Sequence, residues 1–223
     1  MGNGSVKYYR RFTICMLISL IHPSYGRPEK ALATAQNWIR NAGVPVEHIF
    51  SLDSGDPMVN YYVNADSTII NNNDCVVQAV NQAAFKAKGD ILIYLSDDFD
   101  CFEGWAVEIT RIASQYAGEY MIKVSDGLQE FSNQVLTIPI MSRQLYQRLG
   151  YFFYPEYKSM WVDVDLYYVC HRMGVIMPHK EILFQHNHYC NGRSKRDDTY
   201  NRSDAHFNSG KIIYQRRMRQ GFP

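Results

Sequence analysis

The hydrophobic residues in the first half of the chain follow two periods in turn. Residues 12–21 are mainly apolar and contain no Gly or Pro, which predicts a strand buried on both faces. From Pro28, a residue suited to the first turn of a helix, apolar side chains recur at helical spacing until Gly43 ends the pattern. This stretch therefore predicts one strand followed by one helix.

The same succession repeats further along the chain. "VEHIFSL", residues 46–52, predicts a second strand that ends at Asp53 in a turn-rich loop. Residues 74–88 predict a helix with Asp74 as its N-cap, and "ILIYL", residues 91–95, predicts the next strand. Strands that alternate with helices in this way indicate an α/β fold, with a mostly parallel, Rossmann-like central sheet and helices on both faces.

The second half of the chain is less regular. We expect strands over residues 119–124, 134–141 and 182–189, a short helix over 143–149 capped by Ser142, and a helix over 163–173 closed by Gly174. No linker rich in Pro, Gly or Ser interrupts the chain, so we predict a single domain over residues 1–223.

Composition narrows the class of protein. The chain has 46% hydrophobic and 20% charged residues and no internal repeat, which excludes a disordered or fibrous protein. Its five cysteines are odd in number and show no C-x-x-C spacing, which argues against a disulfide framework and against a cysteine zinc site. We therefore expect a reducing compartment and a cytoplasmic protein.

The N-terminal region superficially resembles a signal peptide, because Lys7, Arg10 and Arg11 precede the apolar run of residues 12–21. No small-residue cleavage site follows, and the run is too short to cross a bilayer. We interpret the run as the buried first strand and expect no transmembrane segment.

Charge is unevenly distributed along the chain. From Cys190 onward there are eight Lys or Arg and three Asp, so this segment carries +5, and the rest of the chain carries −4 of the total of +1. A basic terminal segment indicates a phosphate-bearing ligand or a polyanion, although a solvated surface helix explains the same composition.

Three carboxylates follow the strand at residues 91–95. Asp97, Asp98 and Asp100 stand within four positions, where they repel one another unless a cation lies between them. A helix cap, a helix N-terminus or a solvated loop explains one or two of them. Three of them favour Mg²⁺ or Mn²⁺ held together with substrate phosphates, an arrangement that phosphatases and polymerases also use.

Two further pairs of residues are candidates for chemistry. Asp163 and Asp165 lie two positions apart on a predicted helix, so they point to different sides, and the exposed one could serve as a general base. His186 and His188 alternate on a predicted strand and so share a face. This histidine pair is either incidental or a pair of metal ligands.

Five motifs in order resemble the family-2-type glycosyltransferases of GT-A fold, over roughly residues 12–200. They are "SLIHPSYGRPEKA", "SLDSGD", "NQAAFKAKGDILIYLSDDFDCFEGW", "WVDVDLYYVCHRMG" and "FQHNHY". The resemblance implies a metal-dependent enzyme that transfers a sugar from a nucleotide-diphosphate sugar to an acceptor hydroxyl. The expected donor is a UDP-sugar, and the expected outcome is inversion at the anomeric carbon. It also implies a nucleotide-sugar-binding half over 12–118, an acceptor and catalytic half over 119–189, and a basic segment over 190–223.

The resemblance further implies a role for individual residues in donor binding. Pro23 and Tyr25 would line the nucleobase pocket, with Arg27 near the base or the phosphates. Asp53 would accept a hydrogen bond from the base or the ribose, and Asp97 would approach the ribose or the sugar. Apart from the resemblance, we hypothesise that the cations Arg193, Lys195 and Arg196 of the basic segment fold over the diphosphate as a lid once the donor binds.

The implied metal site and catalytic base come from the acidic and histidine motifs. Asp98 would coordinate Mn²⁺ or Mg²⁺, with Asp100 as a second carboxylate and His186 or His188 as a further ligand. Asp163 falls at the position of the catalytic base, and Asp165 stays an alternative because Val162 stands where many relatives have an acid.

Two other classes of function compete with this interpretation. A nucleotidyltransferase would need a Gly-rich loop after the first strand, and "HPSYGRP" has one Gly. A carbohydrate- or nucleic-acid-binding module on a decayed fold would be expected to lose its acidic residues, and here they are intact. The acceptor stays open between a glycan, a lipid-linked or a small-molecule hydroxyl, with modified DNA as an alternative because basic segments attract backbone phosphates.

Overall fold

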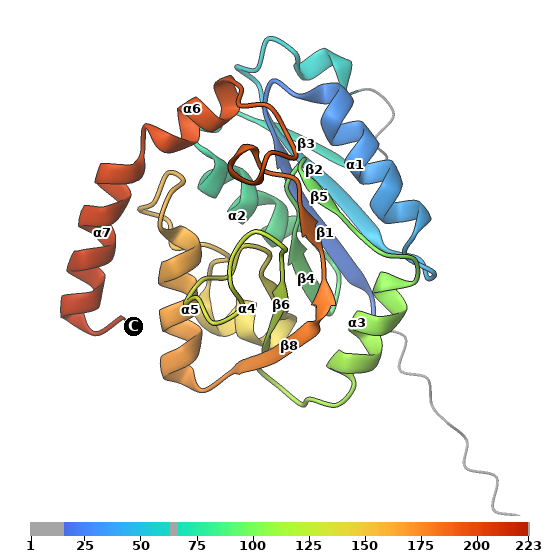
Figure 1. Cartoon of the computed structure of the whole chain (residues 1–223), viewed down its shortest axis with the longest axis vertical. Helices are drawn as coiled ribbons and strands as arrows, with labels where there is room; N and C mark the ends of the chain where they lie inside the picture. The colour runs from blue at the N-terminus through green and yellow to red at the C-terminus, as the bar shows by residue number, and fades with distance from the viewer. Residues whose placement is uncertain (1–15, 63–66, 223) are drawn as a thin grey trace, which may run out of the picture.

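A seven-stranded mixed sheet forms the centre of the part of the chain that this computed structural model describes, residues 16–62 and 67–222 (Figure 1). Its strands are β1 (Ile18–Ser24), β2 (Glu47–Asp53), β3 (Thr68–Asn71), β4 (Ile91–Tyr94), β6 (Met121–Ser125), β7 (Ile140–Ser142) and β8 (Ile176–Leu183). They lie in the order β3-β2-β1-β4-β7-β6-β8, and β7 alone runs antiparallel to its neighbours in the described sheet. The predicted mostly parallel α/β sheet is confirmed. A separate antiparallel pair joins β5 (Phe99–Asp100) to β9 (Gln185–His186).

Helices cover both faces of this sheet (Figure 1). They are α1 (Pro28–Arg40), α2 (Val76–Lys86), α3 (Trp105–Ala113), α4 (Arg143–Leu149), α5 (Val162–Met173), α6 (Asp198–Asp204) and α7 (Phe207–Gln220), with short 3-10 turns η1 (Val59–Tyr61) and η2 (Tyr189–Asn191). Side chains alternate along β4, so Ile91 and Ile93 pack with Trp38 of α1 and Trp105 of α3, while Leu92 packs on the opposite side with α2, α4 and α5. The core is therefore divided into two layers by the sheet.

Two boundaries near the start of the chain differ from the prediction. The first strand, expected over residues 12–21, begins at Ile18 and continues to Ser24, and residues 12–15 lie outside the described residues. Asp74 does not cap α2, because Cys75 takes the N-cap position with an extended backbone and without a side-chain hydrogen bond.

The two later strands also differ from the prediction. Of residues 134–141, only the last two belong to β7, because Asp126 holds the preceding loop by accepting bonds from two backbone N–H groups and from the Thr137 hydroxyl. The strand expected over 182–189 is divided between β8 and β9, since the chain leaves β6 to pair with β5. His188 consequently lies beyond the strand, at the start of η2.

The basic C-terminal segment contains the helices α6 and α7, which the pattern analysis did not predict. It runs from the carboxyl ends of the central strands down to α5, along one side of the molecule (Figure 1). Within the described residues, no helix combines the length and apolarity needed to cross a membrane. Four cysteines, Cys75, Cys101, Cys170 and Cys190, are free thiols, and Cys15 lies outside the described residues.

Candidate active site

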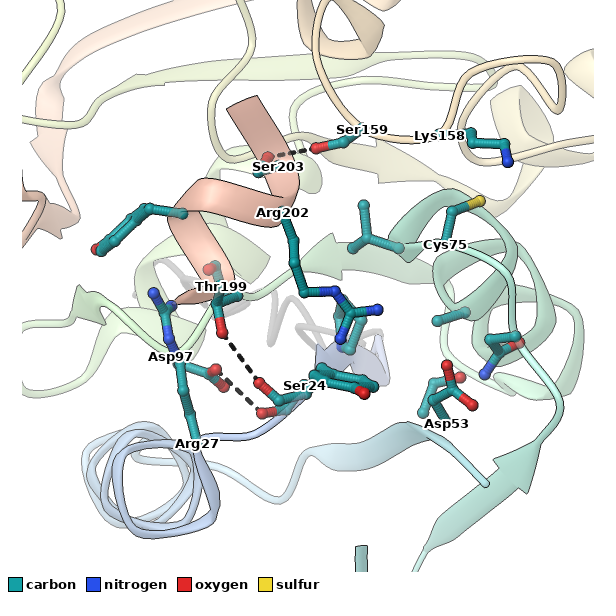
Figure 2. A pocket seen from close by; sticks show the side chains of 18 of the residues that line it. Ser24, Arg27, Asp53, Cys75, Asp97, Lys158, Ser159, Thr199, Arg202 and Ser203 are labelled. Atoms are coloured by element: carbon teal, nitrogen blue, oxygen red, sulfur yellow. Dashed lines mark hydrogen bonds between the residues drawn. The ribbon is translucent and has the colours of Figure 1, made fainter. Parts of the chain in front are cut away.

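A cavity of about 270 Å³ opens at the carboxyl ends of β1, β2 and β4. In open α/β sheets this is the edge at which ligands bind. The strand ends supply Ser24, Asp53 and Tyr94 to its wall, the start of α2 supplies Cys75, and α6 supplies Arg202 from the other end of the chain. Figure 2 shows that Arg202 points from α6 into the space above the strand ends. The cavity thus joins side chains from residues 12–118 with Arg202 of the basic segment 190–223.

Asp98 is the buried carboxylate of this cavity, with 4% of the residue exposed. Its Oδ2 accepts a hydrogen bond from the Tyr200 hydroxyl at 2.7 Å and lies 3.3 Å from Nε2 of His186. Its Oδ1 is buried and has no hydrogen-bond partner among the residues that the structure describes. Burial alone raises the pKa of Asp98, but the hydrogen bonds and charge of His186 and the Tyr200 hydroxyl outweigh it and hold that pKa well below the usual range.

Tyr200 stays protonated in this arrangement. Burial raises the pKa of Tyr200, and the neighbouring Asp98 carboxylate raises it further. The hydroxyl is therefore a donor to Asp98 at any ordinary pH, and Asp98 is a carboxylate with one oxygen satisfied and one bare.

Asp97 lines the cavity, but its side chain is held by the protein. One oxygen lies 3.0 Å from Nε2 of His22, and the other accepts a bond from the Ser24 hydroxyl, also at 3.0 Å (Figure 2). Nδ1 of His22 in turn lies 2.9 Å from Nε2 of His48, and Thr34 donates to the Asp97 carbonyl at 2.7 Å. This buried network fixes the backbone that carries Asp98.

The residues predicted for nucleotide binding separate into two groups. Pro23, Tyr25, Arg27 and Asp53 all line the cavity, whereas Arg193 and Lys195 do not. Asp53 accepts a bond from the N–H of Gly55 at 2.7 Å, and Arg202 places its guanidinium 3.5 Å from the centre of the Tyr25 ring. Arg27 is engaged by Asp197, with Nε to Oδ2 at 2.9 Å.

The two aspartates of α5 have different surroundings. Asp165 is buried and accepts bonds from Arg217 at 2.6 Å and from the Tyr157 hydroxyl at 2.9 Å. Asp163 is half-buried and accepts a local bond from the N–H of Val164. It does not line the cavity, but it is near enough to His186, which does, for the two side chains to interact electrostatically. Burial raises the pKa of Asp163 above the ordinary aspartate value, which suits a proton acceptor.

Asp100 and His188 complete the predicted site residues. Asp100 is exposed, accepts a bond from the amide of Asn187 at 2.7 Å, and does not line the cavity. His188 does line it, with its ring centre 5.0 Å from that of His186 and its Nδ1 accepting a bond from the N–H of Cys190. Of the predicted metal ligands, Asp98, His186 and His188 therefore line the cavity together, and Asp100 does not.

Within residues 16–62 and 67–222, no group of three or more His, Cys, Asp and Glu side chains is arranged to hold a metal ion by itself. The unpartnered, buried Oδ1 of Asp98, on a carboxylate whose Oδ2 lies beside His186, nevertheless fits Mg²⁺ or Mn²⁺, which commonly take one or two protein ligands and complete their shell with substrate phosphates. Nδ1 of His186 is also buried and unpartnered among the described residues.

Several solved structures with a similar fold are those of glycosyltransferases. S. aureus TarS, in complex with UDP, has a TM-score of 0.60 and 15% identity over 76% of this chain and 59% of that one. The mannosyltransferase PcManGT from Pyrobaculum calidifontis, in complex with GDP-Man and Mn²⁺, has a TM-score of 0.57 and 14% identity over 75% and 56%. Glucosyl-3-phosphoglycerate synthase from Mycobacterium tuberculosis, in complex with Mn²⁺, UDP and phosphoglyceric acid, has a TM-score of 0.63 and 12% identity over 94% and 80%.

The described fold is that of the GT-A glycosyltransferases, as the sequence motifs predicted. At these identities the likeness establishes the fold, and the chain spans less than two thirds of TarS and of PcManGT. No protein-family model matches the sequence, and no curated protein does either.

Proposed function

We propose that this chain is a glycosyltransferase that moves a sugar from a nucleoside diphosphate sugar to an acceptor hydroxyl, with Mn²⁺ or Mg²⁺ at Asp98. The observation that carries the proposal is the buried Asp98 carboxylate at the cavity where the parallel strands end: His186 lies beside its Oδ2, and its Oδ1 has no partner among the described residues. The complexes of the similar structures with UDP, GDP-Man and Mn²⁺ support the same chemistry. A UDP-sugar is the first donor to test.

Donor binding is assigned to the strand-end residues. The nucleobase would lie against the Tyr25 ring, with Asp53 as acceptor for a base N–H or a ribose hydroxyl. Arg202 reaches the same cavity and forms no ion pair with a described carboxylate, so its charge is available to the diphosphate. Asp98, with His186 or His188, would hold the divalent cation, which supplies charge stabilisation to the departing diphosphate when bound.

The acceptor proton is assigned to Asp163. This carboxylate lies beside the cavity without an ionic partner among the described residues, and its raised pKa favours proton uptake. Asp165 is committed to Arg217 and lies outside the cavity. A single base on one side of the sugar, with the diphosphate leaving on the other, would invert the anomeric carbon.

The test is release of nucleoside diphosphate from a panel of UDP- and GDP-sugars with Mn²⁺. The parent protein should release UDP or GDP from at least one donor, and Asp98→Asn should reduce that release by at least about 100-fold, the scale expected when a group that stabilises transition-state charge is lost. Asp100→Asn is the matched control, because this carboxylate is exposed and bonded to Asn187. Equal activity of the Asp98 and Asp100 variants would contradict the metal assignment.

The acceptor can be resolved in the same assay. Glycans, lipid-linked hydroxyls, small-molecule hydroxyls and hydroxymethylated DNA are added in turn to the enzyme with its best donor. The true acceptor class should raise diphosphate release above the rate of donor hydrolysis and should become labelled by the sugar.

A further inference from the structure

The Asp98 side chain is also held by a hydrogen bond from a residue near the C-terminal end of the chain. Tyr200, which is 102 residues away in sequence, donates its hydroxyl proton to Oδ2 of Asp98 at 2.7 Å. The Ser194 hydroxyl oxygen lies 3.3 Å from the Tyr200 oxygen and also donates to the Lys195 carbonyl at 3.2 Å, so the shorter contact of the Tyr200 hydroxyl is the one to Asp98. The bond to Oδ2 leaves Oδ1 as the carboxylate oxygen that is still unpartnered among the described residues.

The Tyr200 ring is itself fixed in place. It is buried, with 7% exposed, and its centre lies 4.4 Å from the Arg27 guanidinium and 4.7 Å from the His188 ring. The Tyr189 ring closes a further side at 4.8 Å. A phenylalanine at this position would keep these ring contacts and lose only the bond to Asp98.

The segment that carries Tyr200 is attached to the donor side of the cavity. Thr199 donates to the Tyr25 carbonyl at 3.1 Å, and Asp197 pairs with Arg27. Figure 2 shows Thr199 and Arg27 close to Ser24 and Asp97. The orientation of Asp98 therefore depends on the docking of α6, in addition to the strand β4 that precedes it.

We propose that Tyr200 is a positioning residue for metal binding: it holds Oδ2 of Asp98 so that Oδ1 is presented to the divalent cation. The proposal rests on the proposed function, since it concerns the cation that accompanies the nucleoside diphosphate. Hydrogen-bond partners of ligating carboxylates orient the ligand, and their removal typically costs about 10–100-fold in metal affinity. The loss of a single hydroxyl should therefore be measurable as weaker metal binding.

The experiment measures Mn²⁺ binding directly, without turnover. Free Mn²⁺ is followed by electron paramagnetic resonance during titration of the full chain, in the presence of saturating UDP and, separately, GDP. Tyr200→Phe should weaken Mn²⁺ binding by at least about 10-fold, while UDP or GDP binding without metal changes less than about twofold. A merely structural role for Tyr200 would weaken metal-free nucleotide binding and lower the unfolding temperature together.

Tyr189→Phe is the matched control. This residue lies in the same segment and touches the Tyr200 ring, but its hydroxyl bonds Arg196 and Asp204 and does not reach Asp98. It should bind Mn²⁺ like the parent protein. Unchanged or tighter Mn²⁺ binding by Tyr200→Phe overturns the inference while the proposed function stands, whereas a parent protein that binds neither Mn²⁺–UDP nor Mn²⁺–GDP overturns both.

Discussion

The ion pair between Arg217 and Asp165 offers a quantitative test of how the C-terminal segment is held. Both side chains are 2% exposed, with Nε to Oδ1 at 2.6 Å and Nη2 to Oδ2 at 3.3 Å. The guanidinium also lies 3.4 Å from the centre of the Tyr154 ring, and the Tyr157 hydroxyl bonds the same carboxylate. This arrangement joins α7 to α5 through a charge pair that is almost entirely out of water.

Arg217→Met removes the cation and keeps most of the apolar stem. Asp165 is then left as a buried charge with one remaining donor, Tyr157, and removal of one partner from a buried pair costs about 3–5 kcal/mol. For a chain of this size about 1 kcal/mol corresponds to roughly 2–4 °C, so we expect the unfolding temperature to fall by about 6–20 °C.

The assay is urea unfolding followed by circular dichroism, with thermal unfolding as a second measurement. Arg219→Met is the control, because this exposed side chain of the same helix bonds only the Gln215 carbonyl and should change stability by less than about 0.5 kcal/mol. The double variant Asp165→Leu/Arg217→Met should recover most of the loss, since it leaves no unpaired charge. Equal stability of the Arg217 and Arg219 variants, or a double variant no better than Arg217→Met, would refute the reasoning.

Asp163→Asn should lower the transfer rate by about 100-fold or more with donor affinity nearly unchanged; a rate near that of the parent protein would exclude Asp163 as the base. Burial raises the pKa of Asp163, and a base must be deprotonated to act. As the pH is lowered, kcat/KM should therefore begin to fall at a pH above roughly 3.9, the pKa of a free aspartate. A flat profile down to that pH would argue against this assignment. Burial, with the neighbouring His22, lowers the pKa of His48 to about 3, so the unfolded chain takes up this proton first as pH falls. The free energy of unfolding should therefore decrease between about pH 6.5 and about pH 3, by at most about 1.4 kcal/mol per pH unit from this group, and His48→Gln should remove that part of the slope in urea unfolding at several pH values. Dialysis against EDTA should abolish transfer and added Mn²⁺ should restore it; transfer that persists in EDTA would contradict the metal requirement.

Several strands and helix ends could be predicted from the sequence because these elements are encoded locally. The strand at residues 91–95 is an apolar run bounded by Gly89 and by carboxylates, and its end fixes where Asp98 must lie in a parallel sheet. Ser142 caps α4 by accepting a bond from the N–H of Leu145, as its position before a helical pattern predicted. These features need only neighbouring residues and the topology of the sheet.

The contacts that complete the site could not be predicted in the same way. The bond from Tyr200 to Asp98 joins residues 102 positions apart, and His22 meets Asp97 across 75 positions. Neither pair produces a periodic pattern, and a tyrosine in a polar helix carries no local sign that it will be buried. The same holds for Arg202, which lines the cavity and was not predicted, whereas the predicted lid cations Arg193, Lys195 and Arg196 do not line it.

Several basic residues of the C-terminal segment form ion pairs within the protein, which the sequence did not reveal. Arg196 pairs with Asp204 of its own segment, while Arg216 and Arg217 pair with the acids Glu156 and Asp165 of the preceding loop and of α5. Three of its eight basic residues are therefore paired with acids, and two of them, Arg216 and Arg217, hold the segment to the rest of the domain.

Asp163 and Asp165 divide two tasks on one helix. At about 100° per residue, side chains two positions apart point roughly 160° away from each other, so one carboxylate can face the cavity side while the other faces α7. Asp165 anchors α7 through Arg217, and the segment leading to α7 carries Tyr200 to Asp98. On the proposed function, α5 therefore supplies the base, Asp163, and also secures the segment that orients the metal ligand, Asp98. Loss of the Arg217 anchor should weaken Mn²⁺ binding even at temperatures where the domain stays folded.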